Sequence, residues 1–487
     1  MKIARPVILL YVCSAVMAVG QKPTDRIVNE ALKPSSLESN LERLTDQIGG
    51  RVPGTPAMQK AVDLGVEAFK AAGADSVHTE EFSIQSGWTE GDTEMTVVAP
   101  ETFRVRAISK AWAPALAPVE HVALIDVGRG APSDFAKAEN LASAILLVHS
   151  DEMRTWDDLG AEYTNARHIV NRAIAAKALA IAFQSTRPHD LLYRHTNAVE
   201  GEIDRIPMVL VAREDASRMA RLLASGQKLY ADLAIPNQIS GPITASNVVA
   251  ELQGSQDPDE FVVLGAHLDS WELGTGALDN GCNAALVVDA LRAIKNSGER
   301  PRRTIRFILF SGEEEGLVGS YSYVRAHRSE MDKAVAVVIF DSGIGQLTGF
   351  SLGGRRDVIP TAKKILSTVK PVAGLGFTTD AGADTDNYDF MMEGVPTLVA
   401  NEQEANYLIN YHASSDTFDK VDISQLKRHV AEAAGVTFAL ANAARRLGPR
   451  LTRDQIAQTL RETRLDETLK GSVLWQEWET SQRGREK

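Results

Sequence analysis

The stretch at residues 261–279, FVVLGAHLDSWELGTGALD, decides the fold expected of this chain. Its first six residues are apolar or small and predict a buried strand, which ends in the polar residues His267 and Asp269. Burying a polar group without a partner costs about 2–7 kcal/mol. We therefore expect a compensating partner at the end of this strand, and a metal ion is the obvious candidate.

Downstream of residue 246, similar strand patterns alternate with helical ones. Apolar strand patterns occur at 260–266, 304–310, 334–340 and 396–400. Helical patterns follow at 283–295, 318–327, 358–369 and 423–446. This alternation predicts an α/β fold with a mixed, mostly parallel, doubly wound sheet that carries helices on both faces.

Upstream, residues 35–73 show two helical patterns that the loop-like segment GGRVPGTP at 49–56 links, and strand-like pieces follow between 76 and 108. A separate series of short strands and helices begins near residues 114–118 and closes near 239–242. Because it lies between two segments that look like parts of one sheet domain, we interpret it as an inserted α/β domain. The tail at 451–487 is charged and is expected to be helical, and Trp475 and Trp478 are too apolar for a free tail.

The N-terminus and the composition constrain location and partners. Residues 1–20 combine two basic residues with an apolar run at 6–19 and small residues, which is typical of a cleaved export signal and too short for a comfortable membrane span. We expect an exported protein, periplasmic or secreted. The net charge of −12 argues against nucleic acid as a partner. Loss of Cys13 with the signal would leave only Cys282, which is expected to be buried and inert rather than reactive.

Polar residues of the kinds that bind metals follow three of the predicted strands. His267 and Asp269 lie two residues apart and so face the same side of their strand. Glu313, Glu314 and Glu315 follow the next strand, and Asp341 follows the third. Asp279 follows the first strand through a loop, and His412 lies in a loop after the fourth. The carboxyl ends of parallel strands are where open α/β sheets place their sites.

Each of these clusters also has an ordinary structural explanation. A single His is more often a core or surface residue, a Glu triplet can form a solvated first helical turn, and Asp341 could cap a turn. Their occurrence together at one sheet edge favours a metal site. A set of His, Asp and Glu without Cys points to zinc or a similar divalent ion.

Four segments, taken in order, resemble a known family. They are GAHLDSWELGTGALDNG, FILFSGEEEGLVGSYSY, FDSG and YHASSDT. They resemble the zinc aminopeptidase family of di-zinc exopeptidases, which includes glutamate carboxypeptidase-like members, and HLDSW and GxGAxD are most like the carboxypeptidase Q branch. The resemblance implies the zinc-exopeptidase fold. It also likens the inserted block to a protease-associated domain.

With the resemblance, the chain divides into five expected segments. These are a signal peptide at 1–20, the first part of the catalytic domain at 21–115, the inserted domain at 116–240, the metal-site part of the catalytic domain at 241–450, and the helical tail at 451–487.

The resemblance also implies roles for individual residues. One zinc ion would be held by His267 and Asp341, and a second by Glu314 and His412, with Asp279 bridging the two. Glu313 would be the general base, and Asp269 would orient His267. No ligand is missing, although Asn280 stands where many members have a second Asp.

The residues expected around the substrate have two interpretations each. Tyr411 matches a Tyr that stabilises the oxyanion, or it is an ordinary packed aromatic. Thr385 and Asp386 match a pair on the substrate side, or they cap a helix. Arg194 and His195, in an insert loop with Arg187 and His189, could meet a substrate carboxylate, but a solvated loop is the favoured interpretation. Trp271 could line the pocket or pack beneath it.

These features predict an exopeptidase of the dipeptidase or aminopeptidase type, acting on small unblocked peptides through a water activated by Glu313. Two alternatives stay open: a glutaminyl cyclase-like acyltransferase, which needs one metal ion, and a non-catalytic binding module on the same fold. The resemblance makes a homodimer a further expectation.

Overall fold

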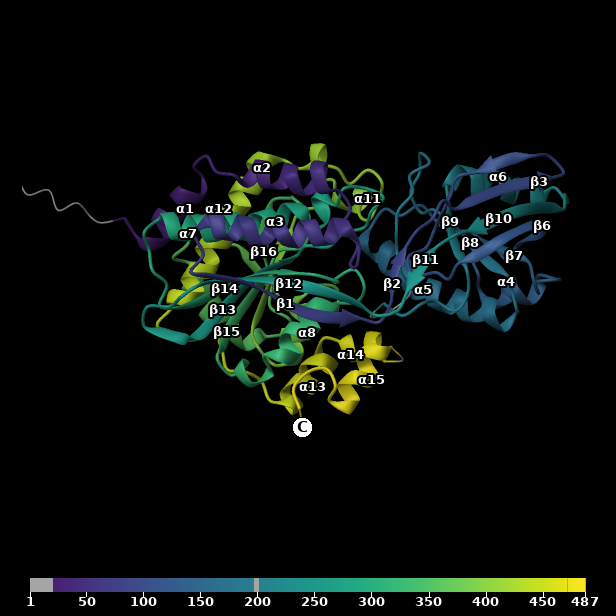
Figure 1. Cartoon of the computed structure of the whole chain (residues 1–487). Coiled ribbons are helices and arrows are strands. Elements are labelled where there is room, and N and C mark those ends of the chain that lie inside the picture. Colours follow the sequence, from purple (N-terminus) through teal and green to yellow (C-terminus); the bar gives the residue numbers. More distant parts are fainter. Residues whose placement is uncertain (1–20, 197–200, 471, 487) are drawn as a thin grey trace, which may run out of the picture.

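The structure, a computed structural model, describes residues 21–196, 201–470 and 472–486 and contains two α/β units (Figure 1). The expected signal peptide at 1–20, with Cys13, lies outside the described residues. Within the described part of the chain, no helix is both long and apolar enough to cross a membrane.

The first unit is built on an eight-stranded sheet. In spatial order its strands are β1 (Ser76–Ile84), β12 (Ile243–Leu252), β14 (Arg303–Phe310), β13 (Asp257–His267), β15 (Ala334–Ile339), β18 (Thr397–Glu402), β16 (Leu347–Ser351) and β17 (Gly376–Thr378). The four strands from β14 to β18 in this order pair in parallel. The antiparallel pairs lie outside them, at β1–β12, β12–β14 and β18–β16. The predicted α/β fold class is confirmed.

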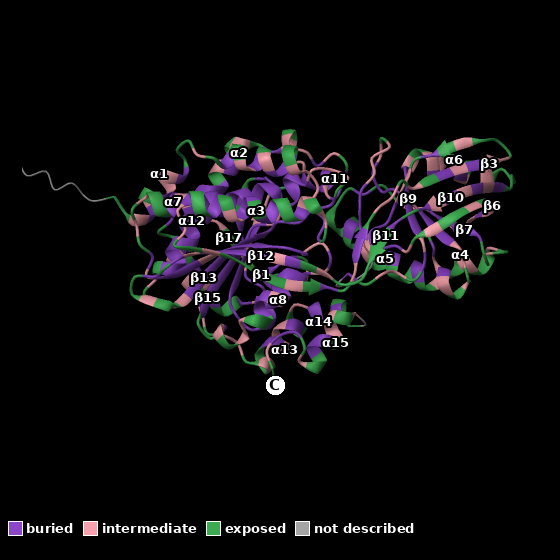
Figure 2. Ribbon diagram, in the orientation of Figure 1, coloured by how far each residue is buried: buried purple, intermediate pink, exposed green. Residues whose placement is uncertain are grey.

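Helices cover both faces of this sheet. One face packs against α1 (Pro23–Ala31), α2 (Leu37–Glu42), α3 (Pro56–Ala72), α7 (Cys282–Asn296), α9 (Ile359–Leu366) and α12 (Ile423–Asn442). The other packs against α8 (Val318–Ala326) and α10 (Asn387–Met392). The C-terminal helices α13 (Arg453–Glu462), α14 (Leu465–Leu469) and α15 (Val473–Thr480) pack outside α8 and α10. In Figure 2 the central strands β13 and β15 are mostly buried between these layers, whereas the edge strand β1 is largely exposed. The expected helical tail therefore completes one side of the unit.

The second unit is built on another eight-stranded sheet (Figure 1). In spatial order its strands are β4 (Phe103–Val105), β3 (Glu94–Ala99), β10 (Leu229–Ile235), β6 (Leu116–Asp126), β7 (Ile145–Val148), β8 (Ala180–Gln184), β9 (Met208–Val211) and β5 (Ala107–Ser109). Its helices are α4 (Pro132–Lys137), α5 (Trp156–Ala175) and α6 (Arg213–Ala224). This sheet includes residues 94–109, which precede the expected start of the insert at 116. We call residues 94–235 the inserted unit.

Tryptophan side chains pack where the two units meet. Trp88, in β2 (Gly87–Thr89), stacks on Trp112 with ring centroids 5.6 Å apart, and Trp112 meets the edge of Trp271 at 6.2 Å. Strand β2 pairs with β11 (Gln238–Ser240) beside them. Trp271 is buried in this cluster, as expected for a residue that packs beneath the pocket.

The helical stretch expected at 35–73 is divided by a loop, as predicted. Helix α2 and a following helical turn at Arg43–Ile48 end before the Gly-rich segment at 49–54, and α3 begins at Pro56. Gly49 and Gly54 both have a positive φ of 85°, which L side chains rarely adopt and which breaks the helix.

Candidate metal centre

The predicted ligands converge at the carboxyl ends of the parallel strands. His267 is the last residue of β13, and the Glu triplet follows β14. Asp341 follows β15, and Asp279 lies in the turn that leads into α7. His412 follows the short helix α11 (Tyr407–Asn410). The sheet topology thus brings residues from five separate segments to one edge.

These side chains form two groups that share Asp279. In the first, His267 Nε2 lies 3.2 Å from Asp279 Oδ1 and 3.2 Å from Asp341 Oδ1. In the second, His412 Nε2 lies 3.2 Å from Asp279 Oδ2 and 2.9 Å from Glu314 Oε2. Within each group the possible ligand atoms lie within 4.8 Å of one another. The two oxygens of Asp279 therefore face two different groups.

The charges of this cluster fit a divalent cation. Glu314 Oε1 is buried and has no hydrogen-bond partner among the residues that the structure describes. Burial and the neighbouring Asp279 raise the pKa of Glu314 to about 7. Burial lowers the pKa of His412, but the charges of Glu314 and Asp279 outweigh it and raise the pKa to about 9. Several buried carboxylates in one place need a compensating cation, and the His, Asp and Glu donors suit zinc.

The second nitrogen of each His is held by a backbone carbonyl. His267 Nδ1 donates to the carbonyl of Asp269 at 3.0 Å, and the Asp269 carboxylate is farther away, at 3.7 Å. Asp269 Oδ2 instead accepts the backbone N–H of Glu314 at 3.2 Å. His412 Nδ1 donates to the carbonyl of Arg194 at 2.9 Å. With the proton on Nδ1, both rings present the Nε2 lone pair to a metal ion.

Asp416 is a site residue that sequence reasoning missed. Its carboxylate accepts the backbone N–H groups of Ala277, Leu278 and Asp279 at 3.1, 2.7 and 3.1 Å. These bonds fix the turn that carries Asp279. Asp416 belongs to the YHASSDT segment, so its position in that motif was the available signal.

Arg51 is a second such residue. Its buried guanidinium donates to the carbonyls of Leu268, Thr275 and Gly276 at 2.7, 2.7 and 2.9 Å. It therefore closes the loop between His267 and Asp279. No pattern around residue 51 indicates this role, because all three acceptors are more than 200 residues away in the chain.

A cavity of about 420 Å³ opens onto this centre. It is lined by the ligands His267, Asp279, Asp341 and His412, by Glu313, Ser342, Asp384, Tyr407 and Tyr411, and by Trp156, Leu159, Gly160 and Tyr163 of α5. Both units thus contribute to its walls.

Glu313 and Tyr411 both line this cavity. Glu313 belongs to neither ligand group. Burial and the charges of Asp341 and Glu314 raise its pKa well above the usual range, which strengthens the carboxylate as a base. The ring of Tyr411 stacks on His412, with centroids 3.7 Å apart, and burial raises the pKa of its phenol, which therefore keeps its proton and can donate a hydrogen bond.

The structure buries the pair Thr385 and Asp386 outside the lining of this cavity. Asp386 precedes α10 without making a side-chain cap. The neighbouring Asp384 is exposed and lines the cavity instead.

The solvated-loop interpretation of the insert residues is wrong for three of the four. Arg187, Arg194 and His195 are buried, and only His189 is exposed. The guanidinium of Arg194 donates to the carbonyl of Ser109 and to the carboxylates of Glu90 and Glu272. Because these internal partners already pair with the Arg194 guanidinium, it is not free to bind the carboxylate of a substrate, as the sequence allowed.

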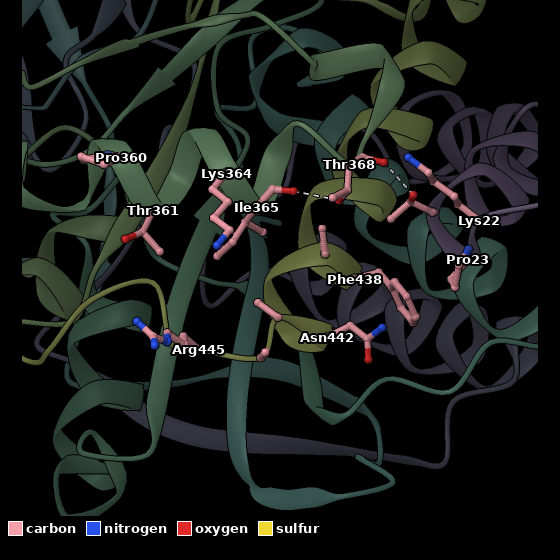
Figure 3. Close-up of a pocket in the computed structure, with 14 residues that line it drawn as sticks. Lys22, Pro23, Pro360, Thr361, Lys364, Ile365, Thr368, Phe438, Asn442 and Arg445 are labelled. Carbon is pink, nitrogen blue, oxygen red and sulfur yellow. Dashed lines mark hydrogen bonds between the residues drawn. The ribbon is translucent and has the colours of Figure 1, made fainter.

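A larger cavity, of about 650 Å³, lies elsewhere on the first unit (Figure 3). Its lining comes from the start of α1 and from α9 and α12, with Lys22, Lys364 and Arg445 around it. It contains none of the candidate ligands, so size alone does not identify the site.

Comparisons with known proteins agree with this geometry. Residues 247–437 match the model of peptidase family M28. The chain is 26% identical to carboxypeptidase Q of Mus musculus over 423 residues, covering 85% of this chain and 88% of the relative. It is also 26% identical over 439 residues to carboxypeptidase Q of Homo sapiens, with the same coverage. The resemblance inferred from the motifs is confirmed.

Solved structures give the same result. The peptidase M28 precursor from Shewanella amazonensis superposes with a TM-score of 0.79 at 25% identity, covering 88% of this chain and 98% of that one. A zinc aminopeptidase from Bacillus subtilis superposes with a TM-score of 0.65 at 18% identity, covering 86% and 97%. The second likeness shows the shared fold.

Proposed function

We propose that this chain is an exported, two-zinc exopeptidase that hydrolyses small unblocked peptides. That it is a zinc-type metallo-exopeptidase follows from the family match together with the relatives. The number of ions, the substrate and the export are the proposal. One observation carries the ion count: the two carboxylate oxygens of Asp279 face two separate groups, each with its own His and its own second carboxylate.

In the proposed reaction, Glu313 and Tyr411 each have a separate task. When bound, the two ions would lower the pKa of a water molecule and polarise the peptide carbonyl. Glu313 accepts the proton of the attacking water and returns it to the leaving amine. The phenol of Tyr411 donates a hydrogen bond to the negative charge that develops on the carbonyl oxygen.

The shape of the cavity supports a small substrate. A volume of about 420 Å³ lies in the range of small-molecule sites, about 300–1,000 Å³. A cavity of this size is too small to enclose a folded protein. The exposed carboxylate of Asp384 on its wall is available to the free ammonium group of an unblocked peptide. Trimming from a free end is the expected mode of cleavage.

A peptide library digested by the purified protein and read by mass spectrometry tests this proposal. We expect single residues to be removed from free termini, loss of activity with a chelator, recovery with zinc, and two zinc ions per chain by elemental analysis. Internal cleavage, or full activity in a metal-free sample, would contradict it.

The same experiment separates the alternatives. A glutaminyl cyclase-like enzyme would bind one ion and cyclise peptides that begin with Gln. A binding module would leave every peptide intact. N-terminal sequencing of the exported protein tests the export signal, with a start near residue 21 as the expected result.

A further inference from the structure

The inserted unit reaches the candidate metal centre through residues 192–195. Tyr193 forms an antiparallel bridge with Ala413. On one side of this bridge, the backbone N–H of Arg194 donates to the carbonyl of His412 at 2.9 Å, and on the other, the N–H of Ser414 donates to the carbonyl of Leu192 at 3.0 Å. The main chain of the ligand His412 is therefore paired with the inserted unit.

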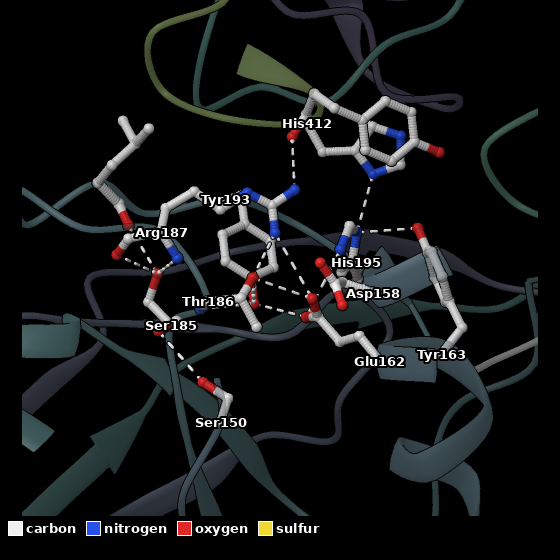
Figure 4. Close-up of polar contacts among 12 residues, drawn as sticks. Ser150, Asp158, Glu162, Tyr163, Ser185, Thr186, Arg187, Tyr193, His195 and His412 are labelled. Carbon is white, nitrogen blue, oxygen red and sulfur yellow. Dashed lines mark hydrogen bonds and ion pairs between the residues drawn. The ribbon is translucent and has the colours of Figure 1, made fainter. Parts of the chain in front are cut away.

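The ring of His412 is held by the same segment. Its Nδ1 donates to the carbonyl of Arg194 at 2.9 Å. The same Nδ1 lies 2.9 Å from Nδ1 of His195 (Figure 4). A proton on His412 Nδ1 can be shared between these two acceptors, which leaves Nε2 directed at Asp279 and Glu314. His195 thus contacts the ligand from the side opposite the metal.

The holding segment is itself firmly anchored. His195 is buried, and its Nδ1 lies 2.9 Å from the hydroxyl of Tyr163 in α5 (Figure 4). The neighbouring Tyr193 donates its hydroxyl to Glu162, and the Arg187 guanidinium packs 3.9 Å from the centre of the Tyr193 ring. A ligand held by such a segment has little freedom to rotate.

His412 needs this support because its backbone is strained. Its φ of 58° lies in the left-handed region, which residues other than Gly rarely adopt and keep only when their surroundings hold them there. The other ligand group is supported differently. The contacts of His267 come from Asp269, Asp279 and Asp341, all in the first unit.

We propose that the inserted unit is a structural part of one metal site: residues 192–195 set the orientation of His412 and so the affinity of the Asp279, Glu314 and His412 group alone. His195 is the positioning residue of that group. This inference rests on the proposed two-ion centre and adds that the two ions depend on different units.

Zinc titration of the metal-free full-length protein by calorimetry tests it. Wild type is expected to show two binding steps. In His195→Phe, which keeps a ring but no acceptor nitrogen, one step should weaken about 10–100-fold while the other is unchanged. His195→Gln, which restores a side-chain acceptor, should recover part of the affinity. A merely structural role for His195 would not separate these two variants.

The matched control is His149→Phe. His149 belongs to the same unit and pairs with Asp126 at 2.9 Å, and neither residue lines the cavity at the metal centre. Both steps should match wild type. Circular dichroism and the melting temperature of each metal-free variant report whether it folds, and His195→Gln provides the measurement if His195→Phe does not.

Variants that keep only one of the two ligand groups show which zinc ion His195 affects. In His267→Ala only the group with His412 remains, and adding His195→Phe should weaken its binding. In His412→Ala only the group with His267 remains, and adding His195→Phe should change nothing. Equal weakening in both backgrounds, or none in either, would overturn the inference.

A failure of the two-ion proposal looks different. If wild type binds one ion, the two-ion centre is wrong. The inference then stands only if that single step is lost in His412→Ala and weakened in His195→Phe, and any other result overturns it.

Discussion

At the scale of single residues, Glu313 lines the cavity but belongs to neither group of candidate metal ligands. Its neighbour Glu314 points to His412, because adjacent residues in an irregular segment direct their side chains differently. Burial raises the pKa of Glu313 and so brings the carboxylate closer to the strength that a general base needs near neutral pH.

Replacing Glu313 separates catalysis from metal binding. Glu313→Gln keeps the size of the side chain but cannot accept a proton, so turnover should fall by about 10²–10⁴-fold while zinc content stays the same. Steady-state kinetics and elemental analysis on one sample measure both. Undiminished turnover would show that another group is the base.

Asp416 acts on the metal centre through the backbone. Asp416→Asn would place an amide N–H₂ against N–H donors in the turn that carries Asp279, so we expect a loss of about 1–3 kcal/mol in the free energy of unfolding and weaker zinc binding. Urea unfolding and zinc titration measure these effects.

The control for Asp416 is Asp419→Asn. Asp419 lies three residues later, is exposed, and pairs with Lys420. This variant should match wild type in both measurements. Equal effects from the two substitutions would show that a general change of charge in this loop, and not the N–H bonds to Asp416, is responsible.

At the scale of elements, an ion pair joins the end of α8 to the edge strand β1. His327 Nε2 lies 3.0 Å from Glu80 Oε2, and Nδ1 lies 3.2 Å from Glu330 Oε1. The hydrogen bond to Glu80 raises the pKa of His327 although burial lowers it. Burial raises the pKa of Glu80, but the bond to His327 outweighs it and lowers that pKa.

These directions fix the pH range of the pair. A raised His pKa stabilises the fold below the unfolded value, about 6.5, and the stabilisation disappears as the pH rises through the folded value. The lowered Glu80 pKa stabilises the fold above about 4.3. Both contributions are present near pH 5.5.

We therefore expect His327→Gln to lower the free energy of unfolding by roughly 1 kcal/mol at pH 5.5, and by clearly less at pH 9. Urea unfolding at both values, in a double-mutant cycle with Glu80→Gln, isolates the pair. A destabilisation that is the same at both pH values would mean that packing, and not charge, accounts for the effect.

At the scale of the whole molecule, metal binding is linked to stability. The proposed ligands come from five segments of the first unit, so they lie together only when that unit is folded. An ion that binds only the folded state adds about 4 kcal/mol when it is present at 1,000 times its dissociation constant.

Zinc should therefore raise the melting temperature of the metal-free protein by several degrees, measured by scanning calorimetry. The double variant His267→Ala/His412→Ala is the control, and its melting temperature should not respond to zinc. A shift of equal size in this variant would show that zinc stabilises the protein at some other place.

The sequence alone indicated the strands, the sheet edge and the candidate ligands. Each ligand follows an apolar run or lies in a motif, and parallel strands bring their carboxyl ends to one edge. An apolar strand ending in His267 and Asp269 needs polar compensation wherever the rest of the chain lies. That local requirement made a metal ion the expected compensation.

Only the tertiary structure decided what holds the ligands in place. Arg51 reaches Gly276, 225 residues away, and His195 reaches His412, 217 residues away. The sequence favoured a solvated loop at 187–195, because Arg and His side chains in a loop are usually exposed. Whether such a side chain is buried depends on which segments pack against it, and contacts between distant segments leave no periodicity or spacing in the sequence.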